Sequence, residues 1–174
     1  MTIKIYTLLD KLEYLPEVAQ LAFQEWEPQL KKEKINNLEE CIQYMNDKFY
    51  TNANSNLKEY PNVFLAIHNT TLYGFAFLEE EDMVDRKHYY PWLSSLYVLP
   101  EYRNQGIASQ LIKTVINCCK INNNNNTTNF QYLYLWCYPQ YYEFYHEKGF
   151  SVLEKKKYCG KKIVIMVYDL SKKY

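Results

Sequence analysis

The sequence is poor in glycine, and this scarcity limits the phosphate-binding loops that it can form. Only 4 of its 174 residues are glycine. A Rossmann fingerprint needs several spaced glycines, and a P-loop needs a Gly-Lys-Ser/Thr ending. Neither pattern occurs in the chain. Any phosphate site must therefore be of another type.

The sequence also lacks an excess of charge and long apolar runs. Lys and Arg together number 20, as do Asp and Glu, so no net charge directs the chain to nucleic acid or anionic lipid. No segment approaches the roughly 20 apolar residues of a membrane span, and no secretory signal is evident. We expect a cytoplasmic protein with no nucleic-acid partner and no membrane partner.

The spacing of the cysteines and histidines predicts neither a disulfide framework nor a metal site. The five cysteines are odd in number and form no Cys-x-x-Cys pair, so we interpret them as reduced, mostly buried thiols. No His, Cys or Asp cluster has metal-ligand spacing, and no metal is expected. The length suits one domain over residues 1–174. Within it, the Asn-rich segment 122–129 is predicted to be a mobile surface loop.

One stretch, residues 96–111, organises the predicted fold. It reads as the end of a strand, a tight turn after Pro100, and a helix that begins near Gly106. The residues between strand and helix carry N–H groups without intrahelical partners, next to the positive end of the helix dipole. They form a potential anion site. Gly106 has no Cβ, so a phosphate can approach its backbone closely. The helical spacing is carried by Ile107, Leu111, Ile112, Val115, Ile116 and Cys119.

Periodicity predicts the other elements. A first helix begins near Pro16 and is expected to end at Pro28. The element order is β-α-α-β-β-β-α-β-α-β-β, with one parallel crossover through the helix after Gly106, which predicts a mixed α/β sheet. Strands are predicted at residues 3–9, 63–67, 72–78, 92–99, 132–136, 151–158 and 163–168, and further helices at 38–49 and 141–148.

The pattern Val-x-Pro-x-x-Arg-x-x-Gly-Ile-Ala at residues 98–108 is similar to the acetyl-CoA loop of the GNAT N-acetyltransferases. Residues 144–150 resemble the family's Phe-Tyr-x-x-x-Gly-Phe segment, and the predicted element order matches the family's from end to end. The resemblance implies the GNAT fold: a mixed, mostly antiparallel sheet of six to seven strands with about four helices. Its central strands would be splayed around acetyl-CoA. Segments that resemble an uncharacterised bacterial GNAT subgroup are 25–26, 81–83, 91–95 and 158–170.

The resemblance implies a cofactor site on the central stretch. The amides of Gln105 to Ala108 would hold the CoA pyrophosphate, bordered by Arg103 and Asn104. Val98 would pair with the pantetheine arm, and the N–H of Leu96 would meet the acetyl carbonyl, as part of the catalytic machinery. The implied cofactor-binding set is Leu96, Tyr97, Val98, Arg103, Asn104, Gln105, Gly106, Ile107, Ala108 and Ser109.

The sequence has a candidate at the family's position for the catalytic acid, but not at its position for the catalytic base. Tyr145 falls where the family keeps the general acid for the departing thiolate, and Tyr141, one helical turn earlier, is the alternative. The histone-modifying branch has a Glu base four residues before the oxyanion position, but here that place is Trp92. The acidic residues 79–82 are candidate bases, directly or through water. A solvated acidic loop is the competing interpretation.

The remaining predictions concern the acceptor and the reaction. Trp26, Glu81, Asp82 and Trp92 are predicted to contact the acceptor, with core packing as the alternative for both tryptophans. Cys137 is interpreted as a buried inert thiol rather than a ping-pong nucleophile. We expect transfer of an acetyl group from acetyl-CoA to a primary amine of a small molecule or peptide, by direct attack in a ternary complex. The alternative is a non-catalytic CoA-binding sensor or interaction module. Monomer and homodimer both remain open.

Overall fold

The computed structural model describes residues 2–51, 62–124 and 129–172. Its described strands form one seven-stranded sheet in the order β1-β2-β3-β4-β5-β7-β6. Neighbouring strands are antiparallel except β4 and β5, which are parallel. The predicted mixed, mostly antiparallel sheet is therefore confirmed. The strands are β1 Lys4–Thr7, β2 Val63–His68, β3 Thr71–Glu79, β4 Trp92–Val98, β5 Tyr132–Cys137, β6 Ser151–Tyr158 and β7 Lys161–Asp169.

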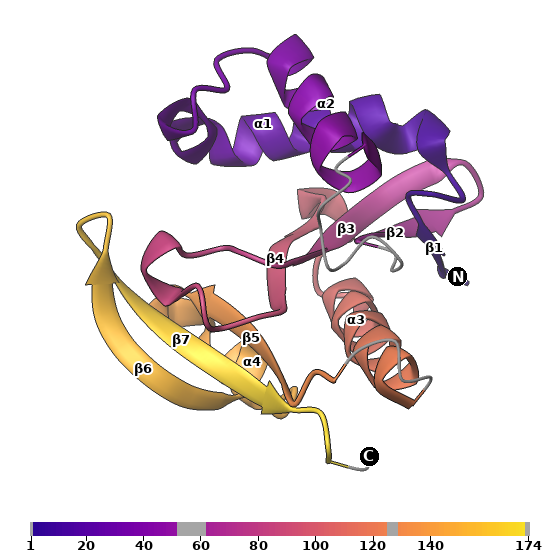
Figure 1. The fold of residues 1–174 in the computed structure, drawn as a ribbon. Coiled ribbons are helices and arrows are strands. Elements are labelled where there is room, and N and C mark those ends of the chain that lie inside the picture. Colours follow the sequence, from indigo (N-terminus) through magenta and orange to yellow (C-terminus); the bar gives the residue numbers. More distant parts are fainter. Residues whose placement is uncertain (1, 52–61, 125–128, 173–174) are drawn as a thin grey trace.

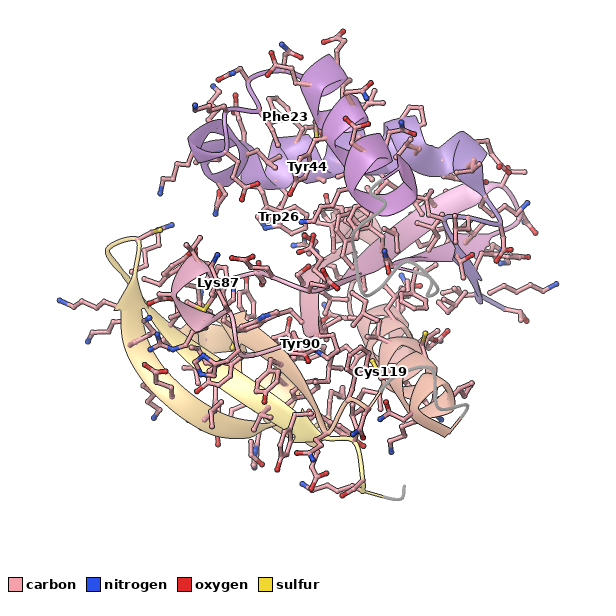
Figure 2. The ribbon with its side chains drawn as sticks, in the orientation of Figure 1. Phe23, Trp26, Tyr44, Lys87, Tyr90 and Cys119 are labelled. Atoms are coloured by element: carbon pink, nitrogen blue, oxygen red, sulfur yellow. The ribbon has the colours of Figure 1, made fainter. Side chains whose placement is uncertain are left out.

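Helices cover both faces of this sheet (Figure 1). α1 and α2 pack on the face that carries Leu65 and Phe75, whereas α3 packs on the face that carries Ala66 and Leu93. Cys119, labelled in Figure 2, lies fully buried within this second layer. Because both faces are covered, β2 and β3 are apolar along their length rather than alternating. The α-helices are α1 Leu15–Lys32, α2 Leu38–Asn46, α3 Ile107–Asn124 and α4 Tyr142–His146.

Two predicted boundaries are wrong. The first helix does not end at Pro28: α1 continues to Lys32, and Trp26 inside it has non-helical dihedrals of φ −118° and ψ 21°. A proline lacks the N–H that the helix needs and crowds the preceding turn, so the helix kinks and then resumes. The predicted Asn-rich loop begins too early, because residues 122–124 form the last turn of α3. Residues 125–128 lie outside the described residues.

The central strands β4 and β5 separate soon after they meet. Trp92 pairs with Tyr134, and the Tyr134 N–H donates to the Pro91 carbonyl at 3.0 Å. Farther along β4, a bulge interrupts its ladder with β3, and Ser95 within it has a φ of +47°. A bulge bends a strand and increases its twist. The predicted splaying of the central strands is thus present, and the bulge contributes to it.

Candidate active site

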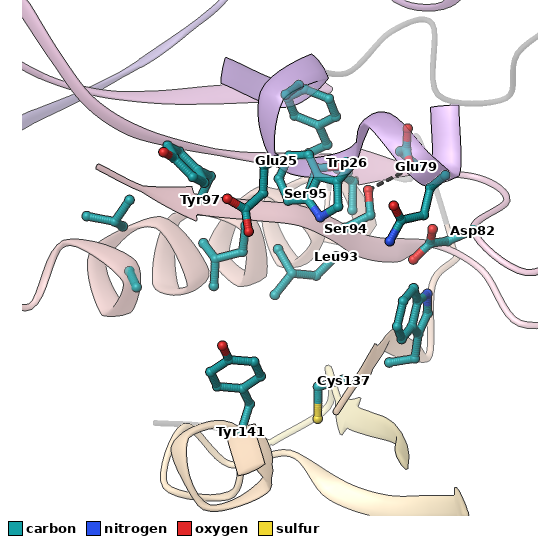
Figure 3. Close-up of a pocket in the computed structure, with 18 of the residues that line it drawn as sticks. Glu25, Trp26, Glu79, Asp82, Leu93, Ser94, Ser95, Tyr97, Cys137 and Tyr141 are labelled. Atoms are coloured by element: carbon teal, nitrogen blue, oxygen red, sulfur yellow. Dashed lines mark hydrogen bonds between the residues drawn. The ribbon is translucent and has the colours of Figure 1, made fainter. Parts of the chain in front are cut away.

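A cavity of about 1180 Å³ lies where β4 and β5 separate. It exceeds the roughly 300–1000 Å³ of typical small-molecule sites, so it has room for a large cofactor together with a second ligand. Figure 3 shows one wall formed by Leu93 and Ser94 of β4, with Cys137 and Tyr141 across from it. One end of the cavity lies at the beginning of α3, and the other lies at the acidic connection between β3 and β4.

The beginning of α3 forms an anion site. Asn104 and Gly106 adopt left-handed backbone conformations with φ of +61° and +78°. The Gly106 carbonyl accepts the first helical hydrogen bond, from the Gln110 N–H at 3.1 Å. The N–H groups of residues 107–109 then have no acceptor inside the helix and lie at its positive end. A Cβ added at Gly106 would meet no protein atom within 4 Å, so the space beside this backbone is open to a phosphate.

Arg103 has a structural contact that sequence reasoning missed. Its Nε donates to the Val98 carbonyl at 2.9 Å, and its guanidinium carbon lies 5.9 Å from the centre of the Tyr97 ring. Arg103 therefore ties the turn to the end of β4 while its charge stays beside the anion site. No sequence pattern indicates this contact, because it depends on how the turn folds back on the strand.

The other predicted cofactor residues lie together with one exception. Leu96 sits in the β4 bulge, where the ladder with β3 skips from Ser94 to Tyr97. Gln105 is exposed and does not line the cavity, and its side chain turns back to the Glu101 carbonyl at 3.4 Å. The predicted residues that line the cavity are Leu96, Tyr97, Val98, Arg103, Asn104, Gly106, Ile107, Ala108 and Ser109.

Tyr145 and its rival Tyr141 both line the wall opposite β4. The Tyr145 ring packs edge-on against Phe150, and burial raises the pKa of its hydroxyl well above the ordinary value of 10. The hydroxyl therefore keeps its proton at neutral pH. Tyr141 is 53% exposed. Burial also raises the pKa of the Cys137 thiol to about 11, so this sulfur is a poor nucleophile.

The acidic end of the cavity contains a hydrogen-bonded network that sequence reasoning also missed. Glu79 is 8% exposed and accepts from Ser94 Oγ at 2.6 Å. Lys48 Nζ lies 2.6 Å from the other Glu79 oxygen and donates to the Tyr44 hydroxyl at 2.9 Å. Burial lowers the pKa of Lys48, but the charge of Glu79 and the hydroxyl of Tyr44 outweigh it and raise that pKa. Lys48 and Glu79 are far apart in sequence, and no motif connects them.

Asp82 lies next to this network, as Figure 3 shows. Burial raises the pKa of Asp82 from its ordinary 3.8 to about 7, and the charge of Glu79 adds to the rise. The Lys48 charge and the indole of Trp136 act in the opposite direction. Trp136 Nε1 is buried without a hydrogen bond of normal geometry, so its effect on Asp82 is a weak one. Asp82 therefore changes its protonation state near neutral pH.

The predicted acceptor residues have different surroundings. Trp26 lines the cavity with its ring edge-on to Tyr97 at 6.2 Å, and Figure 2 shows it below α1. Glu81 lines the cavity too, but its side chain is 49% exposed and lies 3.6 Å from Lys87. For Trp92 the structure supports the core-packing alternative. It is fully buried against Met83 and β7, which cover it and keep it away from the cavity.

Comparison with known proteins identifies the family. The acetyltransferase (GNAT) domain family matches residues 59–152, which is more than half of the chain. The chain belongs to the GNAT acetyltransferase family. This GNAT domain resembles an N-acetyltransferase from Staphylococcus aureus Mu50, with a TM-score of 0.68 at 17% identity over 98% of this chain and 100% of that one. A search of curated protein sequences finds no match.

Two further structures have the same GNAT fold. One is yncA from Salmonella typhimurium, solved with its cofactor acetyl-CoA, with a TM-score of 0.66 at 15% identity over 99% of this chain and 96% of that one. The other is Ard1 from Thermoplasma volcanium, with a TM-score of 0.63 at 11% identity over 97% and 98% of the two chains. At such identities the similarity extends to the fold alone.

The residues of this GNAT domain fit the cofactor of the family. GNAT acetyltransferases use acetyl-CoA. The open space beside Gly106 suits a phosphate, and the broken ladder at Leu96 lies in the same cavity. Among the described residues, no three His, Cys, Asp or Glu side chains are grouped to hold a metal ion. None of the described helices is long and apolar enough to cross a membrane.

Proposed function

We propose that this protein is an acetyl-CoA-dependent N-acetyltransferase that acts on a primary amine of a small molecule or peptide. The observation that carries the proposal is the single cavity that joins the anion site at α3 to the titratable side chains Asp82 and Tyr145. Phosphate binding alone does not require a connection to an acid and a carboxylate, whereas acyl transfer to an amine uses both.

Different residues of the chain would bind different parts of acetyl-CoA. The amides at the beginning of α3 would hold the CoA pyrophosphate, with Arg103 and Asn104 beside it. When bound, acetyl-CoA supplies an activated acetyl thioester. Val98 would pair with the pantetheine arm, and the N–H of Leu96 would donate to the acetyl oxygen as negative charge develops there. Such a donor is worth about 3–4 kcal/mol in enzymes where a side chain supplies it.

Tyr145 would act as the general acid that gives its hydroxyl proton to the departing sulfur. Its place in the lining of the cavity supports the role. Burial raises the pKa of its hydroxyl, so the proton is present at neutral pH, but the same rise makes the hydroxyl a weaker proton donor. Tyr141, which lines the same wall, is the rival acid. We favour direct transfer in a ternary complex because the raised pKa of Cys137 makes a thiolate nucleophile costly. The proposal covers one domain over residues 1–174, working in the cytoplasm as a monomer or homodimer.

A direct test combines binding with turnover. Calorimetric titration should detect CoA binding, and an assay of free thiol should detect CoA release when acetyl-CoA and a suitable amine are both present. The amine panel should include diamines, arylalkylamines, amino acids and peptides with free N-termini. CoA binding without thiol release against the whole panel would contradict the enzyme and favour a CoA-binding sensor. The burial of Trp92 where one GNAT branch carries its base is the observation behind that alternative.

A further inference from the structure

Acetyl transfer to an amine needs a proton acceptor that the proposed function does not yet name. Alkyl amines are mostly protonated at neutral pH, and an ammonium has no lone pair for attack. Trp92 occupies the position of one family base and has neither a titratable group nor access to the cavity. The proton acceptor must therefore be another residue that lines the cavity. This inference rests on the proposed function.

The four acidic residues 79–82, at the end of β3 and directly after it, all line the cavity, but they differ in what they contact. Glu79 is held by Ser94 and Lys48 through two contacts of 2.6 Å each. Both of its oxygens are thus engaged with protein partners. Glu81 is 49% exposed and pairs with Lys87 at 3.6 Å, so it faces solvent more than the reaction.

Glu80 and Asp82 remain. Glu80 Oε1 is buried and has no hydrogen-bond partner. Asp82 lines the cavity, as Figure 3 shows, and it interacts electrostatically with both halves of the sheet: with Glu79 of β3, with Tyr158 of β6 and with the indole of Trp136 in β5. The cavity also runs between these halves, from Trp136 and Tyr158 to β4.

We propose that Asp82 is the general base that takes a proton from the acceptor amine, directly or through one water. Glu79 and Lys48 are positioning residues that set the charge around it. The carboxylate of Asp82 is also the group that would attract the ammonium form of the acceptor into the cavity.

The proton count of the step is complete. The Asp82 carboxylate takes one proton from the ammonium and later returns it to solvent. The freed nitrogen attacks the acetyl carbon, so a C–N bond forms and the C–S bond breaks. The nitrogen loses a second proton to solvent, and the sulfur gains one from Tyr145, which is restored from solvent. The products are the N-acetyl amide and CoA thiol, with one proton released for each ammonium consumed.

The groups that face Asp82 come from several elements. Glu79 lies in β3, Lys48 in the helical turn after α2, Glu33 after α1, and Tyr158 in β6. Glu79 and Glu33 raise the pKa of Asp82, whereas Lys48 lowers it. This arrangement allows the carboxyl to gain and lose a proton near neutral pH, as a base in turnover must.

The test compares Asp82→Asn with Asp85→Asn. Both variants exchange a carboxylate for an amide in the same connection, but Asp85 is half-exposed, pairs with Arg86 and Lys156, and does not line the cavity. In the wild type, kcat/KM should rise with pH through a limb near 7 that stays in place when the acceptor is changed for an amine of different pKa. Asp82→Asn should lose this limb and about 10²–10⁴-fold of kcat/KM at pH 8, while Asp85→Asn keeps both.

Two charge variants give a second readout. Glu79→Gln removes a negative neighbour and should move the limb to lower pH, whereas Lys48→Met removes a positive one and should move it to higher pH. A titration of the wild-type Asp82 carboxyl by carbon NMR, without any substrate, should give a midpoint near pH 7. This measurement requires no variant to fold and no turnover.

The outcomes separate this inference from the proposed function. If the wild type acetylates an amine but Asp82→Asn keeps the limb and the rate, Asp82 is not the base and the acetyltransferase still stands. If Glu80→Gln removes the limb instead, Glu80 is the base. An NMR midpoint below about 5 would also overturn the role. If the wild type releases no thiol against any amine, the proposed function fails and the base role fails with it.

Discussion

Replacing Gly106 by valine should abolish CoA binding without unfolding the protein, and Gly160 provides a matched control. Both glycines are exposed, have φ of +78° and +79°, and would place a new Cβ more than 4 Å from other protein atoms. They differ in place, because Gly106 lines the cavity at the beginning of α3 and Gly160 lies in the turn between β6 and β7. The backbone cost of each substitution should therefore be similar.

The expected magnitudes follow from these conformations. A non-glycine residue held in the left-handed region costs about 1–3 kcal/mol, so Gly106→Val and Gly160→Val should each lower the free energy of unfolding by that amount. At Gly106 the branched side chain also fills the space where a phosphate must approach the amides. Losing two charge-assisted hydrogen bonds of about 1.5–3 kcal/mol each should weaken CoA binding by about 100-fold or more.

The assay is calorimetric titration with CoA, at a temperature where thermal denaturation shows both variants folded. Gly160→Val should bind CoA as the wild type does, and Gly106→Val should show little or no heat of binding. Equal affinity of the two variants would show that no phosphate sits against Gly106. Equal loss in both would instead trace the effect to stability, and the anion site would lose its support.

Three further predictions concern Tyr145, Arg103 and Asp82. Tyr145→Phe keeps the ring but removes the proton, so kcat should fall by about 10²–10⁴-fold with little change in CoA affinity; intact turnover, measured where chemistry limits the rate, would leave the acid to Tyr141 or water. Arg103→Ala should weaken acetyl-CoA binding by about tenfold, and it should lower the melting temperature because the hydrogen bond to the Val98 carbonyl is lost as well. A lower melting temperature with unchanged acetyl-CoA affinity would show that Arg103 has only a structural role. The pKa of Asp82 is higher in the folded chain than in the unfolded chain, so its protonated form favours folding. The free energy of unfolding should therefore fall as the pH rises from about 4 to about 7, by at most about 4 kcal/mol. Asp82→Asn should flatten this fall in chemical denaturation at a series of pH values, and an unchanged slope would contradict the raised pKa.

Local patterns in the sequence were sufficient to predict the order of the elements. The apolar spacing behind Gly106 predicts α3, and the apolar runs at residues 63–67 and 72–78 predict the β2–β3 hairpin. These predictions succeed because helix and strand periodicities are written in neighbouring residues. The family followed from the same stretch, since the turn between β4 and α3 needs specific residues at fixed spacing. Pro28 misled for a related reason: tertiary packing carried α1 through a residue that would end an isolated helix.

The tertiary structure decided which side chains meet. By sequence alone, the four acidic residues 79–82 are equivalent members of a charged run. The fold engages Glu79 with Lys48, from a turn 31 residues earlier in the chain, exposes Glu81, and partly buries Asp82 beside β5 and β6. It also encloses Trp92 beneath β7. Desolvation and long-range charge pairing arise only when distant segments pack together, so the protonation state of each carboxyl depends on contacts that no local pattern contains.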